Sequence, residues 1–126
     1  MSLKIRQREI EGVTILDLNG RITFGEASVA TRDAVRREIN KGSKRILLNL
    51  AEITYIDSAG LGELTSAHTT VKNSEGDLKL LNLTKRVHDL LQITKLCTVF
   101  DVYDDEVKAL AAFGSNEVSQ SNASST

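Results

Sequence analysis

The pattern of hydrophobic and polar residues predicts β-strands in several parts of the chain. Two short runs rich in strand-forming residues, 3–10 and 13–18, flank Glu11-Gly12, and this arrangement predicts an antiparallel hairpin. Residues 46–50 are apolar almost throughout, as expected for a strand covered on both faces. Two further strands are predicted, at 78–83 and 99–103.

Between these strands, the spacing of apolar residues predicts helices. Thr23 and Glu26 have the spacing of a capping box, in which two side chains satisfy exposed amides at a helix start. The helix behind them is predicted to close at Lys41-Gly42. A second helix is predicted to begin around Ser58 and to stop near residues 74–76.

Two shorter helices complete the predicted order. Thr84 opens the first of them. Three acidic residues at 104–106 suit the first turn of the other, where the helix dipole favours negative charge. The predicted inner face of this last helix is Val107, Leu110, Ala111 and Phe113.

This order of elements predicts one α/β domain over residues 1–113. Strands that alternate with helices after an opening hairpin imply a mixed, largely parallel β-sheet with about four helices packed on it. Residues 114–126 consist mostly of Ser, Asn, Gln, Thr and Ala and contain little to bury, so we expect a disordered polar tail.

Composition narrows the function classes. The chain has 126 residues, a net charge of -1 and a pI of about 6.1, which provides no electrostatic footprint for nucleic acid. Basic residues between Arg32 and Arg45 are explained by a solvated helix face, with phosphate or partner binding as the alternative. The single cysteine, Cys97, and the lack of an apolar run of ~18 residues favour a soluble, cytoplasmic protein without a membrane span.

The most informative chemistry lies at Asp57-Ser58-Ala59-Gly60-Leu61-Gly62. A serine at a strand-to-helix junction can cap the helix, or it can be an exposed modification site. A phosphate there would meet free amides and the helix dipole. Gly60 and Gly62 are poor helix formers, which points to close approach of a backbone or partner, or to a tight turn.

Catalysis by Ser58 is the competing hypothesis from a different class. A nucleophilic serine needs an activating base. His68 lies ten residues further along the chain, and His88 belongs to a separate predicted helix. The sequence contains no phosphate-binding loop, cofactor motif or Cys/His ligand cluster, so we expect no enzyme, cofactor or metal, and a small serine hydrolase is the minor alternative.

The Asp57–Gly62 motif, with residues 48–56 before it, resembles the signature of STAS-domain proteins, specifically the bacterial anti-sigma factor antagonists. The opening hairpin and the stretches 90–96 and 99–103 also resemble this family, and the resemblance covers roughly residues 3–113. It implies a protein that binds an anti-sigma factor, itself a serine kinase, while Ser58 is unphosphorylated. Phosphorylation of Ser58 would break that complex, and a phosphatase would reset it.

The resemblance also implies roles for the neighbours of Ser58. Asp57 would shape the local charge, and Gly60, Leu61 and Gly62 would form the helix start presented to the partner. Thr23 stands where many relatives carry an acidic residue, which bears on partner choice. Lys95 stands where glycine is common, which bears on turn geometry.

Two matters stay open at this level. A STAS module that serves as a scaffold, in a stressosome-like signalling complex or as a transporter accessory, would have the same fold. The sequence also leaves undecided whether the protein is a monomer or a homodimer.

Overall fold

The chain opens with the predicted hairpin. The computed structural model describes residues 3–113, and the predicted tail at 114–126 lies outside them. Strand β1 (Leu3–Ile10) pairs antiparallel with β2 (Val13–Ile22). Glu11 and Gly12 both have positive φ, 53° and 81°, which is the two-residue turn whose twist suits a hairpin.

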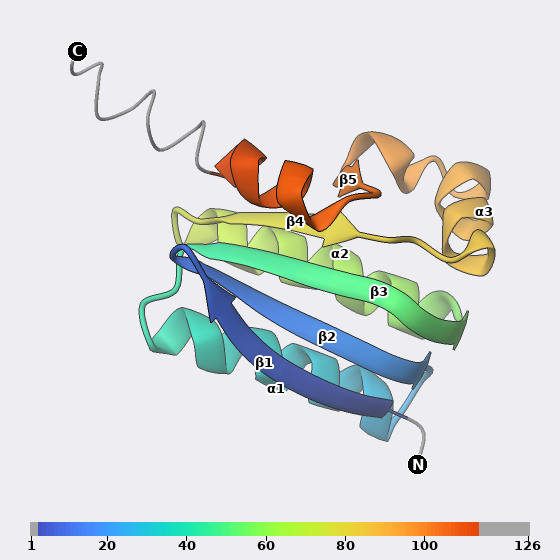
Figure 1. Ribbon diagram of the computed structural model, residues 1–126. Helices are drawn as coiled ribbons and strands as arrows, with labels where there is room; N and C mark the ends of the chain where they lie inside the picture. The colour runs from blue at the N-terminus through green and yellow to red at the C-terminus, as the bar shows by residue number, and fades with distance from the viewer. Residues whose placement is uncertain (1–2, 114–126) are drawn as a thin grey trace.

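The other strands run parallel to β2. The sheet order is β1-β2-β3-β4-β5, with β3 (Arg45–Ile56), β4 (Asp77–Leu81) and β5 (Asp101–Tyr103) each parallel to the strand before it (Figure 1). The mixed, largely parallel sheet is therefore confirmed. Strand β3 is longer than the predicted apolar run and ends directly before the Asp57–Gly62 motif.

Helices cover both faces of this sheet. Helices α1 (Glu26–Asn40) and α2 (Ser58–Asn73) lie side by side on one face, and a C-terminal helix over residues 106–113 lies on the other (Figure 1). Helix α3 (Lys85–Ile93) has Thr84, the residue predicted to open it, as its N-cap, and it leads into the 3-10 turn η1 (Leu96–Thr98). No helix within residues 3–113 is long and apolar enough to cross a membrane.

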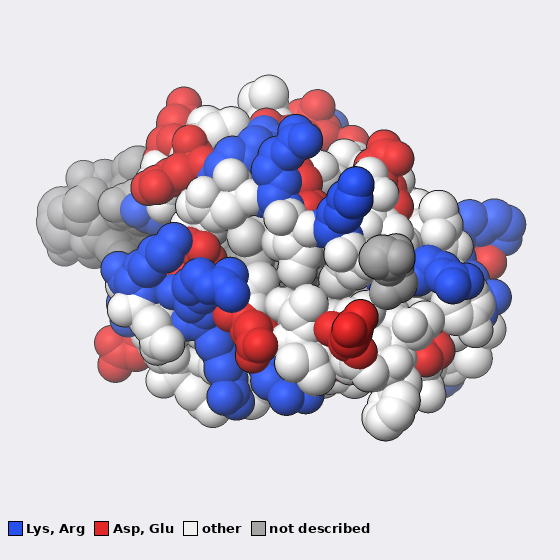
Figure 2. Space-filling view, turned by 90° about the horizontal axis from the view of Figure 1, so that it is seen from below, with Lys and Arg blue, Asp and Glu red and all other residues white. Residues whose placement is uncertain are grey.

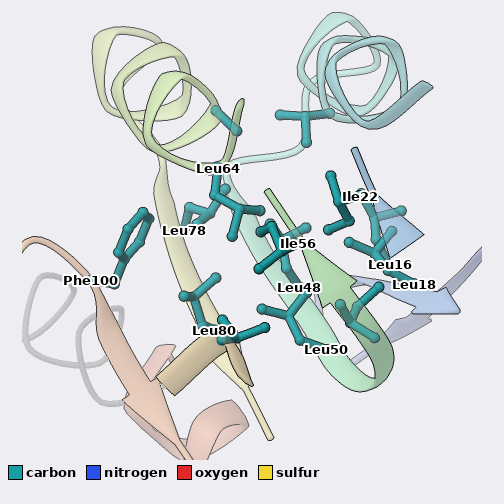
Figure 3. Packing of buried hydrophobic residues seen from close by; sticks show 14 of the residues in the cluster. Leu16, Leu18, Ile22, Leu48, Leu50, Ile56, Leu64, Leu78, Leu80 and Phe100 are labelled. Atoms are coloured by element: carbon teal, nitrogen blue, oxygen red, sulfur yellow. The ribbon is translucent and has the colours of Figure 1, made fainter. Parts of the chain in front are cut away.

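The main core lies between the sheet and helices α1 and α2. Aliphatic side chains from the inner faces of β2, β3 and β4 meet Leu64 of α2 there, and Phe100 closes one end of the cluster (Figure 3). A smaller apolar cluster lies under the C-terminal helix and contains Val13, Ile15, Leu47, Leu81, Ala109 and Phe113. The sheet is therefore buried on both sides at residues 46–48 of the central strand β3, whereas one face of its second half is exposed.

The predicted inner face of the C-terminal helix is only partly right. Phe113 is buried and Leu110 is half-buried, but Val107 is 73% exposed and Ala111 is exposed. Ala109 is fully buried in their place. The helix begins at residue 106. Ala109 and Phe113 are four residues apart and therefore lie on the same face of it, which meets the sheet. The small side chain of Ala109 lets the helix lie close to the sheet.

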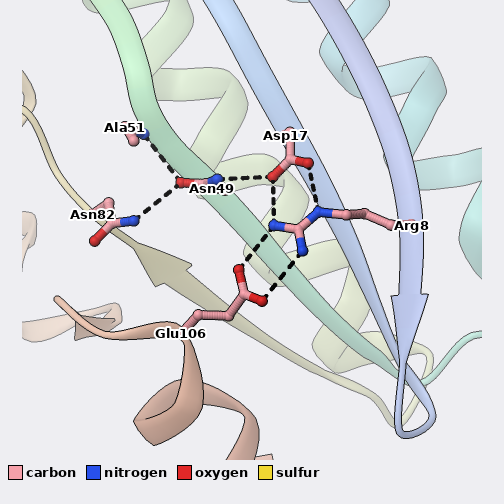
Figure 4. Close-up of polar contacts among 6 residues, drawn as sticks. All are labelled: Arg8, Asp17, Asn49, Ala51, Asn82 and Glu106. Atoms are coloured by element: carbon pink, nitrogen blue, oxygen red, sulfur yellow. Dashed lines mark hydrogen bonds and ion pairs between the residues drawn. The ribbon is translucent and has the colours of Figure 1, made fainter.

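An ion-pair network fixes the first turn of the C-terminal helix to the sheet. The Arg8 guanidinium on β1 donates to both Asp17 carboxylate oxygens, at 2.6 and 3.0 Å, and to both Glu106 oxygens, at 2.8 and 3.2 Å (Figure 4). Asn49 on β3 donates to Asp17 at 2.8 Å. These partners hold the pKa of Asp17 below its usual value, chiefly through Arg8.

Lys95 occupies the turn where the family resemblance would place a glycine. Its φ of 65° and ψ of 20° are in the left-handed region, directly after α3. Glycine adopts this conformation without steric cost, and lysine does not. The departure from glycine thus falls on a residue with a special backbone conformation.

Candidate functional site

Asp57 joins two loops at the carboxyl ends of β2 and β3. Its Oδ1 accepts a hydrogen bond from the Gly60 amide at 2.8 Å, and its Oδ2 accepts one from the Phe24 amide at 3.0 Å. Its own amide donates to the Ile22 carbonyl at 3.3 Å. Asp57 therefore caps α2 and ties the β2–α1 loop to the start of that helix.

Ser58 is the first residue of α2 and is exposed. The capping interpretation of Ser58 is wrong, because the N-cap is Asp57 and its carboxylate satisfies the helix amide. The Ser58 hydroxyl makes no hydrogen bond to any residue in the part of the chain that the structure describes. It is therefore free to react or to be recognised.

The two motif glycines have different surroundings. A Cβ on Gly60 would overlap the Ile22 carbonyl oxygen and would lie 2.9 Å from Ile22 Cγ2. Close approach of a backbone thus explains Gly60, and the approaching backbone is that of β2. A Cβ on Gly62 would meet nothing within 4 Å, and Gly62 is exposed.

Leu61 supports the helix start from beneath. It is 5% exposed and belongs to the main core. Gly60 is buried as well. Of the motif residues predicted to face a partner, Ser58 and Gly62 therefore form the exposed surface, Asp57 is half-buried, and Gly60 and Leu61 fix its position.

The predicted capping box at Thr23 and Glu26 is wrong. The N-cap of α1 is Gly25, with a φ of 107°, and no side chain caps this helix. Thr23 is half-buried, and its backbone carbonyl accepts from the Ser28 amide at 3.2 Å. The Phe24 amide is already bonded to Asp57, so a contact across the fold sets the conformation of this loop.

Sequence reasoning missed two aromatic residues beside this site. Phe24 is 83% exposed although its amide is tied to Asp57. Tyr55, near the end of β3, is 37% exposed, and the Arg86 guanidinium of α3 lies 4.3 Å from its ring centroid. The sequence offers only a weak indication of their exposure, namely that both are aromatic residues near the ends of strands that lead into helices.

The electrostatics of the helix start favour a charged Asp57. The amides of Phe24 and Gly60 hold the pKa of the Asp57 carboxyl below its usual value. Hydrogen bonds to the ionised form explain this direction. Ser58 thus follows a carboxylate that is ionised at neutral pH and already bonded to the amides nearest to it.

Neither histidine contacts Ser58. The His68 ring lies edge-on against Phe100, with a centroid distance of 5.4 Å, and burial lowers its pKa. The His88 Nδ1 is 3.5 Å from an Asp89 carboxylate oxygen. The structure thus pairs each histidine with a residue other than Ser58.

Comparison with known proteins now gives the family. A model of the STAS domain matches residues 4–109. This chain belongs to the STAS domain family. An anti-sigma F factor antagonist of Paenibacillus polymyxa is 30% identical over 115 residues, which cover 87% of this chain and 94% of that protein. The anti-sigma-B factor antagonist of Bacillus subtilis is 29% identical, covering 81% and 92%.

Solved STAS structures agree with the fold. A Thermotoga maritima protein, solved as a candidate anti-sigma factor antagonist, superposes with a TM-score of 0.79 at 26% identity, covering 86% of this chain and 92% of that one. The anti-sigma factor antagonist SpoIIAA is similar in its unphosphorylated and phosphorylated forms, with TM-scores of 0.64 and 0.68. Those two structures are 16% and 18% identical to this chain, of which they cover 91% and 87%, and the match covers 98% and 99% of their own chains.

Proposed function

We propose that this STAS domain is a cytoplasmic, non-catalytic partner switch that acts as an anti-sigma factor antagonist. With Ser58 unphosphorylated it binds an anti-sigma factor that is also a serine kinase, and so frees a sigma factor. Transfer of the ATP γ-phosphoryl group to the Ser58 oxygen, with loss of the hydroxyl proton and release of ADP, ends that binding. A phosphatase hydrolyses the phosphoserine and restores the binding form.

The free, exposed hydroxyl of Ser58 carries this proposal. A kinase must bring the serine oxygen to its own active site, which requires exposure and a hydroxyl that is not already engaged. Asp57 performs the capping that Ser58 could otherwise have performed. The helix start therefore keeps its cap whether or not Ser58 carries a phosphate.

The surroundings of Ser58 are those of an interaction surface. Exposed aromatic and arginine side chains are enriched among residues that dominate binding energy at interfaces. Such side chains come from the β2–α1 loop, from β3 and from α3, as Phe24, Tyr55 and Arg86 respectively. A phosphate would add nearly two negative charges at the helix start and would change this surface sharply.

Named relatives support the same assignment. The antagonists from Paenibacillus polymyxa and Bacillus subtilis match this chain over most of their own length. SpoIIAA, which shares the fold, is known in both unphosphorylated and phosphorylated forms. We extend that behaviour to this chain through Ser58.

The test is phosphorylation by the cognate anti-sigma kinase with ATP, followed by peptide mass spectrometry. The control variant is Ser66→Ala, which removes an exposed hydroxyl further along α2. Wild type and this control should each gain one phosphate, at residue 58. Ser58→Ala should gain none and should still bind the kinase. Phosphate elsewhere on wild type, or undiminished labelling of Ser58→Ala, would contradict the proposal.

A further inference from the structure

Strand β1 leaves one row of backbone groups unpaired. It lies at the edge of the sheet and pairs with β2 alone among the described strands. The two-residue turn closes the hairpin at the pair Ile10–Val13, which exchanges both backbone hydrogen bonds. Such pairs recur at every second residue, so the backbone groups of Leu3, Ile5, Gln7 and Glu9 point outward.

A groove runs between this edge and helix α1. Its volume is about 410 Å³, and Leu3, Ile5 and Gln7 of β1 form one wall. The opposite wall, on α1, combines the small residues Ala30 and Ala34 with the charged residues Asp33, Arg37 and Glu38. Leu3 and Ile5 are half-buried and pack against the main core. Apolar side chains of an added strand would fit against Leu3 and Ile5.

The other face of β1 is basic. Side chains alternate across a strand, so Lys4, Arg6 and Arg8 lie on the face opposite α1. Figure 2, which views the molecule from below, shows both basic and acidic side chains on that surface. Arg8 is neutralised by Asp17 and Glu106, whereas Lys4 and Arg6 make no ion pair within residues 3–113.

Charge decides between a second copy of this chain and another partner. If two copies paired through β1, Lys4 and Arg6 would face the same basic row of the other copy, and like charges placed opposite each other destabilise a strand pair. We propose that the free edge of β1 binds an extended segment of another protein, with apolar side chains toward the α1 groove and acidic side chains toward Lys4 and Arg6. This surface is separate from Ser58, so the proposal does not depend on the switch.

A designed peptide tests this directly. The probe is a fluorescent eight-residue peptide that alternates valine and glutamate, and the comparison peptide alternates valine and lysine. Binding is measured by fluorescence polarisation, and amide exchange of Ile5 and Gln7 is measured by NMR. We expect the acidic peptide to bind and to slow exchange of these two outward amides, while the basic peptide binds at least tenfold more weakly.

Two pairs of variants separate backbone pairing from charge. Gln7→Pro removes an outward amide that the hairpin does not use, whereas Gln7→Ala keeps that amide. Arg6→Glu reverses the charge beside the edge, whereas Arg36→Glu changes an exposed arginine that lines a different groove, between α1 and α2. We expect Gln7→Pro and Arg6→Glu to weaken binding of the acidic peptide at least tenfold, with little effect from the two controls.

Several outcomes would overturn the proposal. One is no binding of the acidic peptide at roughly millimolar concentration, the weak end of specific recognition. Another is equal binding by Gln7→Pro and Gln7→Ala, which would place the peptide elsewhere. Self-association of wild type that Gln7→Pro abolishes would show that a second copy, and not an acidic segment, occupies the edge.

Discussion

Gly60 and Gly62 lie in the same helix, two residues apart, and should respond oppositely to alanine. In Gly60→Ala the new methyl group would overlap the Ile22 carbonyl oxygen and come within 2.9 Å of Ile22 Cγ2. Forced overpacking costs up to about 3 kcal/mol, and the better helix propensity of alanine returns about 1 kcal/mol. We therefore expect Gly60→Ala to lower the free energy of unfolding by about 2 kcal/mol.

Gly62→Ala is the matched control. Its methyl group meets nothing within 4 Å, and Gly62 has no positive φ. Only the better helix propensity of alanine remains, so the free energy of unfolding of this variant should rise by about 1 kcal/mol.

Urea unfolding followed by far-UV circular dichroism measures both effects. With a slope of about 1.5 kcal/mol/M, the midpoint should fall by about 1.3 M for Gly60→Ala and rise by about 0.7 M for Gly62→Ala. Equal stability of the two variants would refute the reasoning, because it would mean that the start of α2 moves away from β2 at little cost. In that case Asp57 would not hold the two loops in a fixed arrangement.

Three further predictions concern single side chains. Asp57→Ala should cost about 1 kcal/mol at neutral pH. Because folding lowers the pKa of Asp57, its contribution is present above the unfolded-state value of about 3.9 and lost as the pH falls through the lower folded-state value. The difference in urea midpoint between wild type and Asp57→Ala should therefore shrink in acid, and a constant difference would argue against the ionised cap. Lys95→Gly should raise the free energy of unfolding by about 0.5 kcal/mol, measured by thermal melting. The steric cost of the left-handed conformation that glycine removes is larger than the conformational entropy that glycine adds to the unfolded chain. A lower melting temperature for Lys95→Gly would contradict this. Glu106→Gln should weaken the half-exposed contact to Arg8 by about 0.5 kcal/mol and speed amide exchange in the helix at 106–113 in low salt, while unchanged exchange there would show that apolar packing alone holds this helix.

Most of the fold could be predicted because its strands and helices have clear local signals. The hairpin carries a two-residue turn, and Thr84 caps α3 with a side chain three residues from the amide it binds. Such features depend on residues close together in the chain. The order of strands and helices then limits the topology, because parallel strands joined by helices favour right-handed crossovers within one sheet.

The features that sequence missed depend on contacts between distant segments. Thr23 has the right spacing to cap α1, but it does not do so. The loop before α1 is held by Asp57 instead, whose carboxylate accepts a hydrogen bond from the amide of Phe24, 33 residues away in the chain. Ala109 packs on the sheet because the C-terminal helix is anchored at Glu106 by Arg8, 98 residues away. No local pattern contains either partner.

At the site, the motif identified Ser58, but the sequence did not show which motif residue caps the helix, which one is buried in the core and which ones are exposed. In the structure Asp57 holds the amides of Phe24 and Gly60, and Leu61 anchors the helix in the core. A phosphate on Ser58 would therefore find the amides of Phe24 and Gly60 occupied and a carboxylate beside it, and repulsion between these charges would direct the phosphate outward. In the proposed switch, the partner would thus detect a change in surface charge on a helix start whose packing stays the same.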